Sequence, residues 1–401
     1  MAGSQSRIAL PAIAGGAPAF PGGLALIRPP VGDPDAVARE IRDILAGGML
    51  TNGARVRELE ERAAEYLDVR HCVAVSSCTA GLMLMFRAAD VSGEVVVPSF
   101  TFAATVHAVA WNNLRPHFAD IDLDTLTLSA AAAGRAVGVR TAAMMATHTY
   151  GTPADASTLA DVARRNGIRL FFDAAHAFGS RVGGRPVGGL GDGEVFSLSP
   201  TKVLVAAEGG LIATNDDMLA ERCRIGRDYA NPGDYDCLFV GLNARMSEVH
   251  AAIALASLDG LEERIVERNA IADRYHRALR EVPGVSFPQV RAGDRSTFKD
   301  LTVLVEPGEF GATADELAAA LEAEGIESKR YYSPPVHAMR AYRTGVAPNG
   351  DLKTTDWASE RVLSLPLWSG MTEEPDRVAE AVARVQRHLA VRAGAQKRYA
   401  G

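Results

Sequence analysis

Two charged residues of this sequence are flanked in a way that suits amine chemistry. Asp173 ends the apolar segment 170–172, and Lys202 follows a second apolar segment and precedes the pair Gly209–Gly210. A lysine amine forms a Schiff base with the aldehyde of pyridoxal 5′-phosphate (PLP), and a carboxylate keeps the pyridine nitrogen of that cofactor protonated. The order of the two residues and their flanking segments therefore predict a PLP site.

Both residues also have ordinary interpretations. A lone lysine is usually solvated on the surface, and an aspartate after a strand often caps the next helix. A carboxylate at the end of so apolar a strand is costly to bury without a partner, which favours a paired or functional role for Asp173. His176 follows closely and would face the same way in a helical turn, although a lone histidine is more often a satisfied polar group than a catalyst.

Two earlier segments lie between an expected strand and an expected helix. Residues 76–82 would offer a phosphate the free N–H groups of a helix start, with a hydroxyl from Ser77 or Thr79, or would form an ordinary helix cap. Residues 98–102 bring in Phe102, which either stacks on a flat heterocycle or packs in the core. Both segments thus suit a cofactor without requiring one.

Two later segments stay open on residue types alone. Asn243 opens an expected helix and is either its cap or a ligand contact. Residues 328–337 mix cations with aromatic rings, which suits a pyrophosphate and a base but equally suits an exposed loop.

The elements that must position these residues alternate along the chain. Strands and helices in alternation predict a mostly parallel sheet covered on both faces, with ligands at the carboxyl ends of the strands. Asp173 and the motifs near residues 77, 99 and 148 fall at such ends. We expect strands at 73–75, 94–97, 115–119, 142–148 and 170–172, and helices at 79–89, 101–111 and 156–165.

We expect three parts in the chain. Residues 1–35 are rich in Ala, Gly and Pro and predict an extended N-terminal arm, which could lie on a partner subunit. Residues 36–260 form the large α/β domain, and residues 261–401 form a smaller C-terminal α+β domain. The smaller domain contains a strand near 300–306 and a final helix over 374–391.

Local signals predict three helix features. Gly47–Gly48 stops the first helix, and Gly260 kinks the long helix that begins at Ser247. Thr313 and Glu316 have the spacing of a capping box at the start of a helix.

The composition excludes several classes of protein. The chain has 401 residues, 47% hydrophobic and 23% charged, with a net charge of -7, which argues against a nucleic-acid coat. Its four cysteines form no C-x-x-C pair, so we expect no metal site and a reducing, cytoplasmic location. No apolar run reaches the ~18 residues that a membrane-spanning helix requires.

Several motifs together resemble a known family. The sequence is similar to the DegT/StrS-type sugar aminotransferases, which are PLP enzymes of fold type I, over nearly its whole length. The motifs that carry the resemblance lie at residues 77–81, 98–102, 148–151, 173–177, 197–210 and 241–248.

The resemblance implies a role for each matching residue. Lys202 would carry PLP and move the proton, and Asp173 would pair with the pyridine nitrogen. Phe102 would stack on the ring, where many relatives have Trp or Tyr. His176 stands where many relatives carry Gln and would contact the ring hydroxyl. The phosphate would be held by Cys78, Thr79 and Ser197, next to the candidate hydroxyl of Ser77.

The resemblance also implies partners. Asn243 would reach the phosphate in the neighbouring subunit, so a homodimer with shared active sites is expected. A nucleotide-sugar would lie near residues of the segment 328–337, namely Lys329, Arg330, Tyr331, Tyr332 and His337.

The implied reaction consists of two half-reactions. The resemblance implies that an amino acid, most often glutamate, converts PLP to pyridoxamine 5′-phosphate, which then aminates a nucleotide-linked 4-keto-6-deoxy sugar, with dTDP as the expected nucleotide. A C3-keto sugar and a cyclitol are alternative acceptors that no residue excludes. A PLP-dependent dehydratase would carry histidine in place of Lys202, and a non-catalytic regulator would be expected to lose Lys202 or Asp173.

Overall fold

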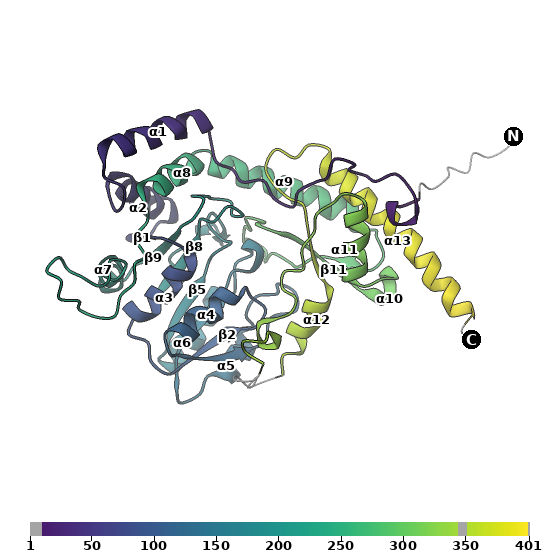
Figure 1. Ribbon diagram of the computed structural model, residues 1–401. Coiled ribbons are helices and arrows are strands. Elements are labelled where there is room, and N and C mark those ends of the chain that lie inside the picture. The colour runs from purple at the N-terminus through teal and green to yellow at the C-terminus, as the bar shows by residue number, and fades with distance from the viewer. Residues whose placement is uncertain (1–9, 344–350, 400–401) are drawn as a thin grey trace.

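The centre of the fold is a seven-stranded sheet of order β1-β9-β8-β5-β4-β2-β3 (Figure 1). The computed structural model describes residues 10–343 and 351–399. β9 is antiparallel to both its neighbours, and the neighbouring strands β8, β5, β4, β2 and β3 pair in parallel. The expected mostly parallel sheet is therefore confirmed. The strands are β1 (His71–Val75), β2 (Glu94–Pro98), β3 (Arg115–Ala119), β4 (Thr141–Thr147), β5 (Arg169–Asp173), β8 (Gly193–Ser197) and β9 (Gly210–Thr214).

Helices cover both faces of this sheet because alternate residues of each strand point to opposite sides. On one face Val73 and Val75 pack with α3, α4 and α7, and on the other Cys72 and Ala74 pack with α2 and α8. Burial on both faces explains the continuous apolar runs of the strands. The covering helices are α2 (Ala54–Leu67), α3 (Cys78–Ala88), α4 (Ala103–Trp111), α5 (Ala130–Ala136), α6 (Ala156–Asn166), α7 (Asp217–Gly226) and α8 (Glu248–Leu258).

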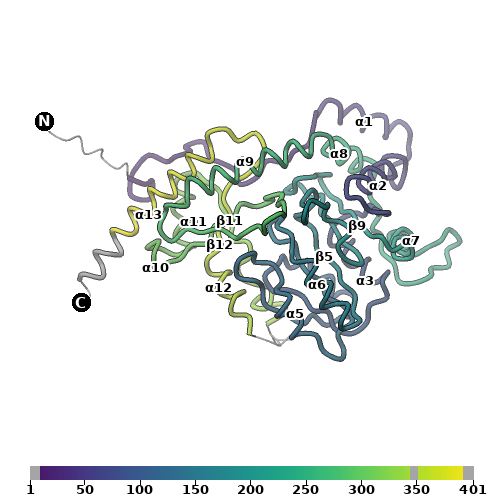
Figure 2. Tube along the Cα trace, turned by 180° about the vertical axis from the view of Figure 1, so that it is seen from behind, coloured from purple at the N-terminus to yellow at the C-terminus, as the bar shows by residue number. Residues whose placement is uncertain are grey.

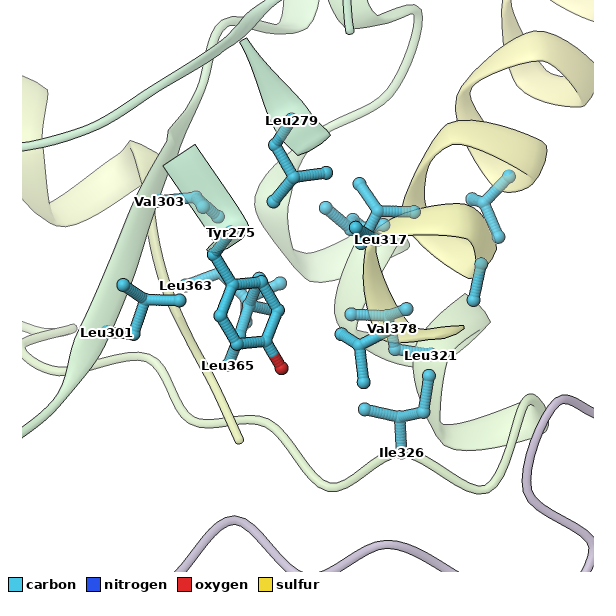
Figure 3. Close-up of a cluster of buried hydrophobic side chains, with 14 of the residues drawn as sticks. Tyr275, Leu279, Leu301, Val303, Leu317, Leu321, Ile326, Leu363, Leu365 and Val378 are labelled. Carbon is cyan, nitrogen blue, oxygen red and sulfur yellow. The ribbon is translucent and has the colours of Figure 1, made fainter. Parts of the chain in front are cut away.

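A second, antiparallel sheet of order β10-β11-β12 has its own core. Figure 3 shows Tyr275 at the centre of that core, between Leu301 and Leu365 of the sheet and Leu321 of α11. The Tyr275 hydroxyl donates to the Pro366 carbonyl oxygen over 2.9 Å, so its polar atom is satisfied inside the core. The elements are β10 (Val285–Ser286), β11 (Leu301–Val305), β12 (Val362–Leu365), α9 (Leu261–Leu279), α10 (Pro307–Phe310), α11 (Ala314–Ala323), α12 (Lys353–Arg361) and α13 (Glu374–Tyr399).

The predicted helix signals are confirmed. Gly48 ends α1 (Pro34–Gly47) with a φ of 74°, and the Thr313–Glu316 capping box starts α11. Gly260, with a φ of 69°, separates α8 from α9. α8 and the start of α9, with Leu261 and Ile265, pack in the core of the large sheet, and the rest of α9 packs in the core of the small sheet, so the two helices carry the chain from one core to the other.

The described part of the N-terminal arm packs against its own chain (Figure 2). After the short 3₁₀ helix η1 (Ala12–Ala14), Leu24 bridges to Ile326 and the Phe20 N–H donates to the Glu324 carbonyl oxygen over 2.9 Å. Phe20 and Leu24 thus pack in the core of the small sheet. Residues 1–9 of the expected arm lie outside the described residues. Within the described ranges, the structure has no helix that is long and apolar enough to span a membrane.

Candidate active site

A cavity of about 330 Å³ opens at the carboxyl ends of β4, β5 and β8. One wall comes from the large sheet and its helices, and the other from Lys299, Asp300 and the Tyr331–Tyr332 pair. The cavity brings together most of the residues that the sequence singles out, namely Ser77, Cys78, Thr79, Phe102, Asp173, His176, Ser197, Lys202, Tyr331 and Tyr332.

Asp173 is a buried carboxylate at the end of β5, with 3% of its surface exposed. Its Oδ2 accepts a hydrogen bond from the Thr105 hydroxyl over 2.6 Å, and its Oδ1 accepts from the Ala175 N–H over 3.1 Å. Burial raises the pKa of this carboxyl, and the two hydrogen bonds oppose the rise. A cationic group entering the cavity would therefore be a strong partner for Asp173.

Lys202 lies in the loop between β8 and β9, which the Lys202 N–H ties to the Ser199 carbonyl oxygen over 3.0 Å. Burial, followed by the nearby Lys299 cation, lowers the pKa of the Lys202 amine to about 8. The amine forms no ion pair or hydrogen bond with the residues that the structure describes. It is thus a primary amine of reduced basicity at the cavity wall, as a Schiff-base lysine needs.

The start of α3 lines the cavity with unpaired backbone donors. Ser77 caps the helix, its Oγ accepting from the Ala80 N–H over 3.1 Å. The N–H groups of Cys78 and Thr79 have no acceptor among the described residues. Gly210 makes room for this turn, because a Cβ there would lie 2.8 Å from the Cys78 nitrogen. Free N–H groups at a helix start suit an anion.

Phe102 and His176 both line the cavity wall but differ in how far their side chains are exposed. Phe102 caps α4 and is 60% exposed, so its ring is available to stack on a flat ligand. His176 is buried, and burial followed by the Lys202 and Lys299 cations lowers its pKa, which keeps the imidazole neutral. The His176 Nδ1 atom has no hydrogen-bond partner among the described residues.

The 328–337 segment divides between the cavity and the surrounding structure. Tyr331 and Tyr332 line the cavity, and Tyr332 stacks on Tyr150 with ring centroids 6.2 Å apart. Arg330 instead donates to the Ser359 carbonyl oxygen over 2.8 Å and pairs with Asp315.

Lys329 and His337 also lie outside the cavity lining. Lys329 lies 3.8 Å from Glu327 and is about half exposed. His337, in the 3₁₀ helix η3 (Val336–Ala338), is held between Ser99, at 2.7 Å from its Nδ1, and Asp356, at 3.2 Å from its Nε2.

Asn243 also lies outside the lining of this cavity. It is exposed, in the segment between α7 and α8 that projects from the large sheet (Figure 1). The same segment exposes Tyr229, Leu238 and Val240 by 51%, 63% and 76%. Exposed apolar side chains of this kind are typical of an interface with another protein surface.

Sequence reasoning missed Lys299, Asp300 and Thr105. Lys299 and Asp300 precede the fully buried strand β11, and their amine and carboxylate lie 2.7 Å apart. The signal was available, because charges joined to a wholly apolar strand must be paired or functional, as for Asp173. Thr105 had no signal, since a threonine within a helix is ordinary.

Comparison with known proteins identifies the kind of chain. The model of the DegT/DnrJ/EryC1/StrS aminotransferase family matches residues 34–383. A relative from Geobacillus stearothermophilus, named pleiotropic regulatory protein, is 32% identical over 360 residues, or 88% of this chain and 95% of the relative.

Solved structures of high similarity include DesI, DesV and TlmJ. DesI in the presence of its TDP-sugar product is 37% identical, with a TM-score of 0.89 over 96% of this chain and 98% of DesI. DesV from S. venezuelae, in complex with a ketimine intermediate, is 31% identical, with a TM-score of 0.83 over 90% of this chain and 99% of DesV. The aminotransferase TlmJ from Streptoalloteichus hindustanus is 30% identical, with a TM-score of 0.84 over 92% and 99%.

Proposed function

Because this chain belongs to the DegT/DnrJ/EryC1/StrS aminotransferase family and is a PLP-dependent sugar aminotransferase, we propose that it converts a dTDP-linked 4-keto-6-deoxy sugar to the 4-amino sugar. Glutamate is the proposed amino donor. The TDP-sugar product present with DesI, which is 37% identical, supports the nucleotide. Position 4 rests on the sequence resemblance.

The single observation that carries the proposal is that Asp173, Lys202 and the start of α3 line one cavity. The donor set fits PLP: unpaired N–H groups for its phosphate, an exposed aromatic ring for its flat face, a buried carboxylate for its ring nitrogen and an amine for its aldehyde. When bound, the cofactor supplies a ring that accepts electrons from the substrate carbon.

We propose the following work for the chain's own residues. Lys202 holds the cofactor and later moves a proton at the substrate carbon, for which a pKa of about 8 is suitable near neutral pH. Asp173 keeps the ring nitrogen protonated, and Thr105 orients Asp173. Phe102 stacks on the ring, and His176, as a neutral imidazole, contacts the ring hydroxyl.

The phosphate is proposed to bind at the start of α3. Cys78 and Thr79 offer backbone N–H groups, and the hydroxyls of Ser77, Thr79 and Ser197 line the same cavity. Asn243 is proposed to complete the phosphate site of a partner subunit in a homodimer. Its exposure beside apolar side chains, away from its own cavity, supports this arrangement.

The nucleotide-sugar is proposed to lie along residues 328–337. Tyr331 and Tyr332 already line the cavity. Lys329, Arg330 and His337 stay proposed contacts, and Arg330 and His337 would have to exchange their present partners Asp315 and Asp356 for the ligand.

The division into 1–35, 36–260 and 261–401 also stays a proposal, supported by the separate cores of the two sheets. A cytoplasmic location is proposed from the cysteines, all four of which are free in the structure.

A regulator without catalysis is a second candidate, since one relative is named a pleiotropic regulatory protein. Such a protein needs neither the amine of Lys202 nor the carboxylate of Asp173. Both line the cavity here, and the enzyme activity of the family therefore remains the better proposal.

Chemical trapping tests the proposal. The purified protein should absorb visible light with PLP bound, and borohydride reduction should leave a pyridoxyl group on Lys202, located by peptide mass spectrometry. Supplying L-glutamate and a dTDP-4-keto-6-deoxyhexose should then yield the amino sugar, and Lys202→Ala should give none. A pyridoxyl group on another lysine, or a trapped Lys202 without any sugar product, would contradict the cofactor and substrate assignments respectively.

A further inference from the structure

The cavity contains a buried ion pair that the proposed reaction has not used. The Lys299 Nζ and Asp300 Oδ1 atoms lie 2.7 Å apart, and the two side chains are 3% and 1% exposed. Removing two charges from water is expensive, and the mutual attraction of a pair often repays that cost only in part. A buried pair on the wall of a ligand cavity therefore suggests a ligand.

The segment before Asp300 is held firmly in place. Arg268, buried within α9, donates to the carbonyl oxygens of Thr297, Phe298 and Lys299 over 3.1, 2.6 and 3.1 Å. The Thr297 hydroxyl in turn donates to the His176 carbonyl oxygen over 2.7 Å. The backbone that carries the ion pair is thus fixed to both α9 and the loop after β5.

The pair has hydrogen-bonding capacity to spare. Lys299 forms one hydrogen bond, to Asp300, and lies 5.1 Å from the centroid of the Tyr331 ring, which leaves N–H groups for an anion. The Asp300 Oδ2 atom is buried without a hydrogen-bond partner among the described residues, and so is His176 Nδ1, at 4.0 Å from it. Lys299, Asp300 and His176 all belong to the lining of the cavity.

The position of the Lys299–Asp300 ion pair limits which anion it can bind. Lys299 is close enough to Lys202 to help lower the pKa of that amine. In any amino-acid donor, the α-carboxylate is attached to the carbon that carries the amine, so it must enter beside the amine of Lys202. The diphosphate of a nucleotide-sugar is separated from the reacting carbon by the sugar ring and lies further away.

We propose that Lys299 binds the α-carboxylate of the amino-acid donor, and that Asp300 neutralises Lys299 when the uncharged sugar ring replaces the donor. This inference rests on the proposed function. It answers a requirement of any such enzyme, which must accept an anion and a neutral ring in one cavity. A cation without Asp300 would be left buried and unpaired in the sugar-bound state, which is unfavourable.

Asp300 has a second use in the sugar-bound state. Its unpartnered Oδ2 can accept a hydrogen bond from a sugar hydroxyl, which the donor amino acid lacks at that place. The pair therefore presents a cation to one substrate and an acceptor to the other.

A comparison of two donors tests the proposal. L-Isoglutamine has an uncharged amide in place of the α-carboxylate of L-glutamate and is otherwise matched to it. The first half-reaction is followed by the absorbance of the holoenzyme, and the ratio of kcat/KM values for the two donors is measured. The unchanged protein should prefer L-glutamate by about 10- to 100-fold, as expected for a charge-assisted hydrogen bond.

Three variants identify the residue responsible. Lys299→Met/Asp300→Asn removes both charges without leaving either one buried alone, and should reduce the preference to about threefold or less. Lys299→Met should do the same, and Lys299→Arg should keep most of the preference. The ratio is measured within each variant, so a general loss of stability or cofactor cancels.

The second half-reaction is the internal control. With the amino-sugar product as the donor in reverse, kcat/KM of Lys299→Met/Asp300→Asn should fall less than it does with L-glutamate. A preference for L-glutamate that survives in the double variant would overturn the role of Lys299, and so would an unchanged protein that prefers L-glutamate by less than about threefold. An unchanged protein that reacts with neither amino donor nor amino sugar would instead refute the proposed function.

Discussion

The environment of the Asp173 carboxylate determines how it can act. Burial favours its neutral form, and the hydrogen bonds from Thr105 and Ala175 favour its anion. The anion is the form that a protonated ring nitrogen requires, so the hydrogen bonds prepare Asp173 for a cationic partner.

Asp173→Asn should therefore retain PLP but lose about a thousandfold or more in kcat, which is at least ~4 kcal/mol of barrier. An amide cannot stabilise the protonated ring nitrogen. Cofactor content by absorbance and turnover with L-glutamate measure the two effects. Thr105→Val, which removes only one hydrogen bond to Asp173, is the graded control and should lose about tenfold. A near-normal rate in Asp173→Asn would rule out its role.

Because of the Lys202 amine, we expect the stability of the protein to depend on pH. Its pKa of about 8 lies below the ~10.4 of an unfolded chain. Between these two pH values the unfolded state binds more protons than the folded state, so the cofactor-free protein becomes more stable as the pH rises from 8 to about 10.4. Below pH 8 the folded protein bears the full cost of burying the protonated amine. Lys202→Met removes this cost. The free energy of unfolding of the variant minus that of the unchanged protein should therefore be greater at pH 7 than at pH 10.5, by up to about 3 kcal/mol.

Denaturant unfolding of the cofactor-free proteins at the two pH values measures this difference. Lys329→Met is the matched control, because it removes a lysine whose side chain is about half exposed and pays little for burial. If the stability difference between Lys202→Met and the unchanged protein is the same at both pH values, burial does not disfavour the protonated Lys202 amine.

The sequence predicted the site residues that end strands and begin helices. Asp173 and Lys202 were found because a charge beside an apolar strand is unusual. Lys299 and Asp300 carry the same signal before β11, and were missed because nothing local shows that this strand faces the first sheet. The contact between the two halves of the cavity depends on packing at long range.

At the scale of elements, Arg268 links α9 to the segment that forms the cavity wall. Besides the residues before Asp300, it donates to the Leu367 carbonyl oxygen over 3.3 Å. Burial lowers the pKa of its guanidinium to about 10, so the side chain is still a cation at neutral pH.

Arg268→Met should lower the free energy of unfolding by about 3 kcal/mol or more, because several buried carbonyl oxygens lose their donor. Arg274→Met is a control on the same helix. Among the described residues Arg274 pairs with the largely exposed Asp376, so this variant should lose less than about 1 kcal/mol. Urea unfolding of both variants makes the comparison. If the two variants lose equal free energy of unfolding, Arg268 contributes no more to stability than a surface ion pair does.

The elements themselves were well predicted where periodicity is local. The strands β1 to β5 of the large sheet, the helices α3, α4 and α6, the capping box at Thr313 and a kink at Gly260 were expected, whereas the helices α5 and α7 were not. The antiparallel direction of β9 was not, because an apolar run buried on both faces reads the same in either direction. The helix α2 was also not predicted, although Val56, Leu59, Ala63 and Leu67 recur at helical spacing.

At the scale of the molecule, the segment that carries Asn243 predicts shared active sites. Mixed refolding of Lys202→Ala chains with Asn243→Ala chains, each inactive alone, should restore activity. In a mixed dimer one site receives both defects and the other receives neither, so random mixing should recover about a quarter of the original activity. Mixed dimers that form but stay inactive would place Asn243 in its own subunit's structure only.

The packing of the N-terminal arm has a consequence for how the protein is made. The Ala19 N–H donates to the Glu324 carboxylate over 2.8 Å, across 305 residues of sequence. A ribosome that adds about 5 to 20 residues per second needs on the order of 15 to 60 s to cover that distance. The large sheet can therefore form on the emerging chain before the arm has a partner, and the arm can pack into the core of the small sheet only after the residues near Glu324 have been made.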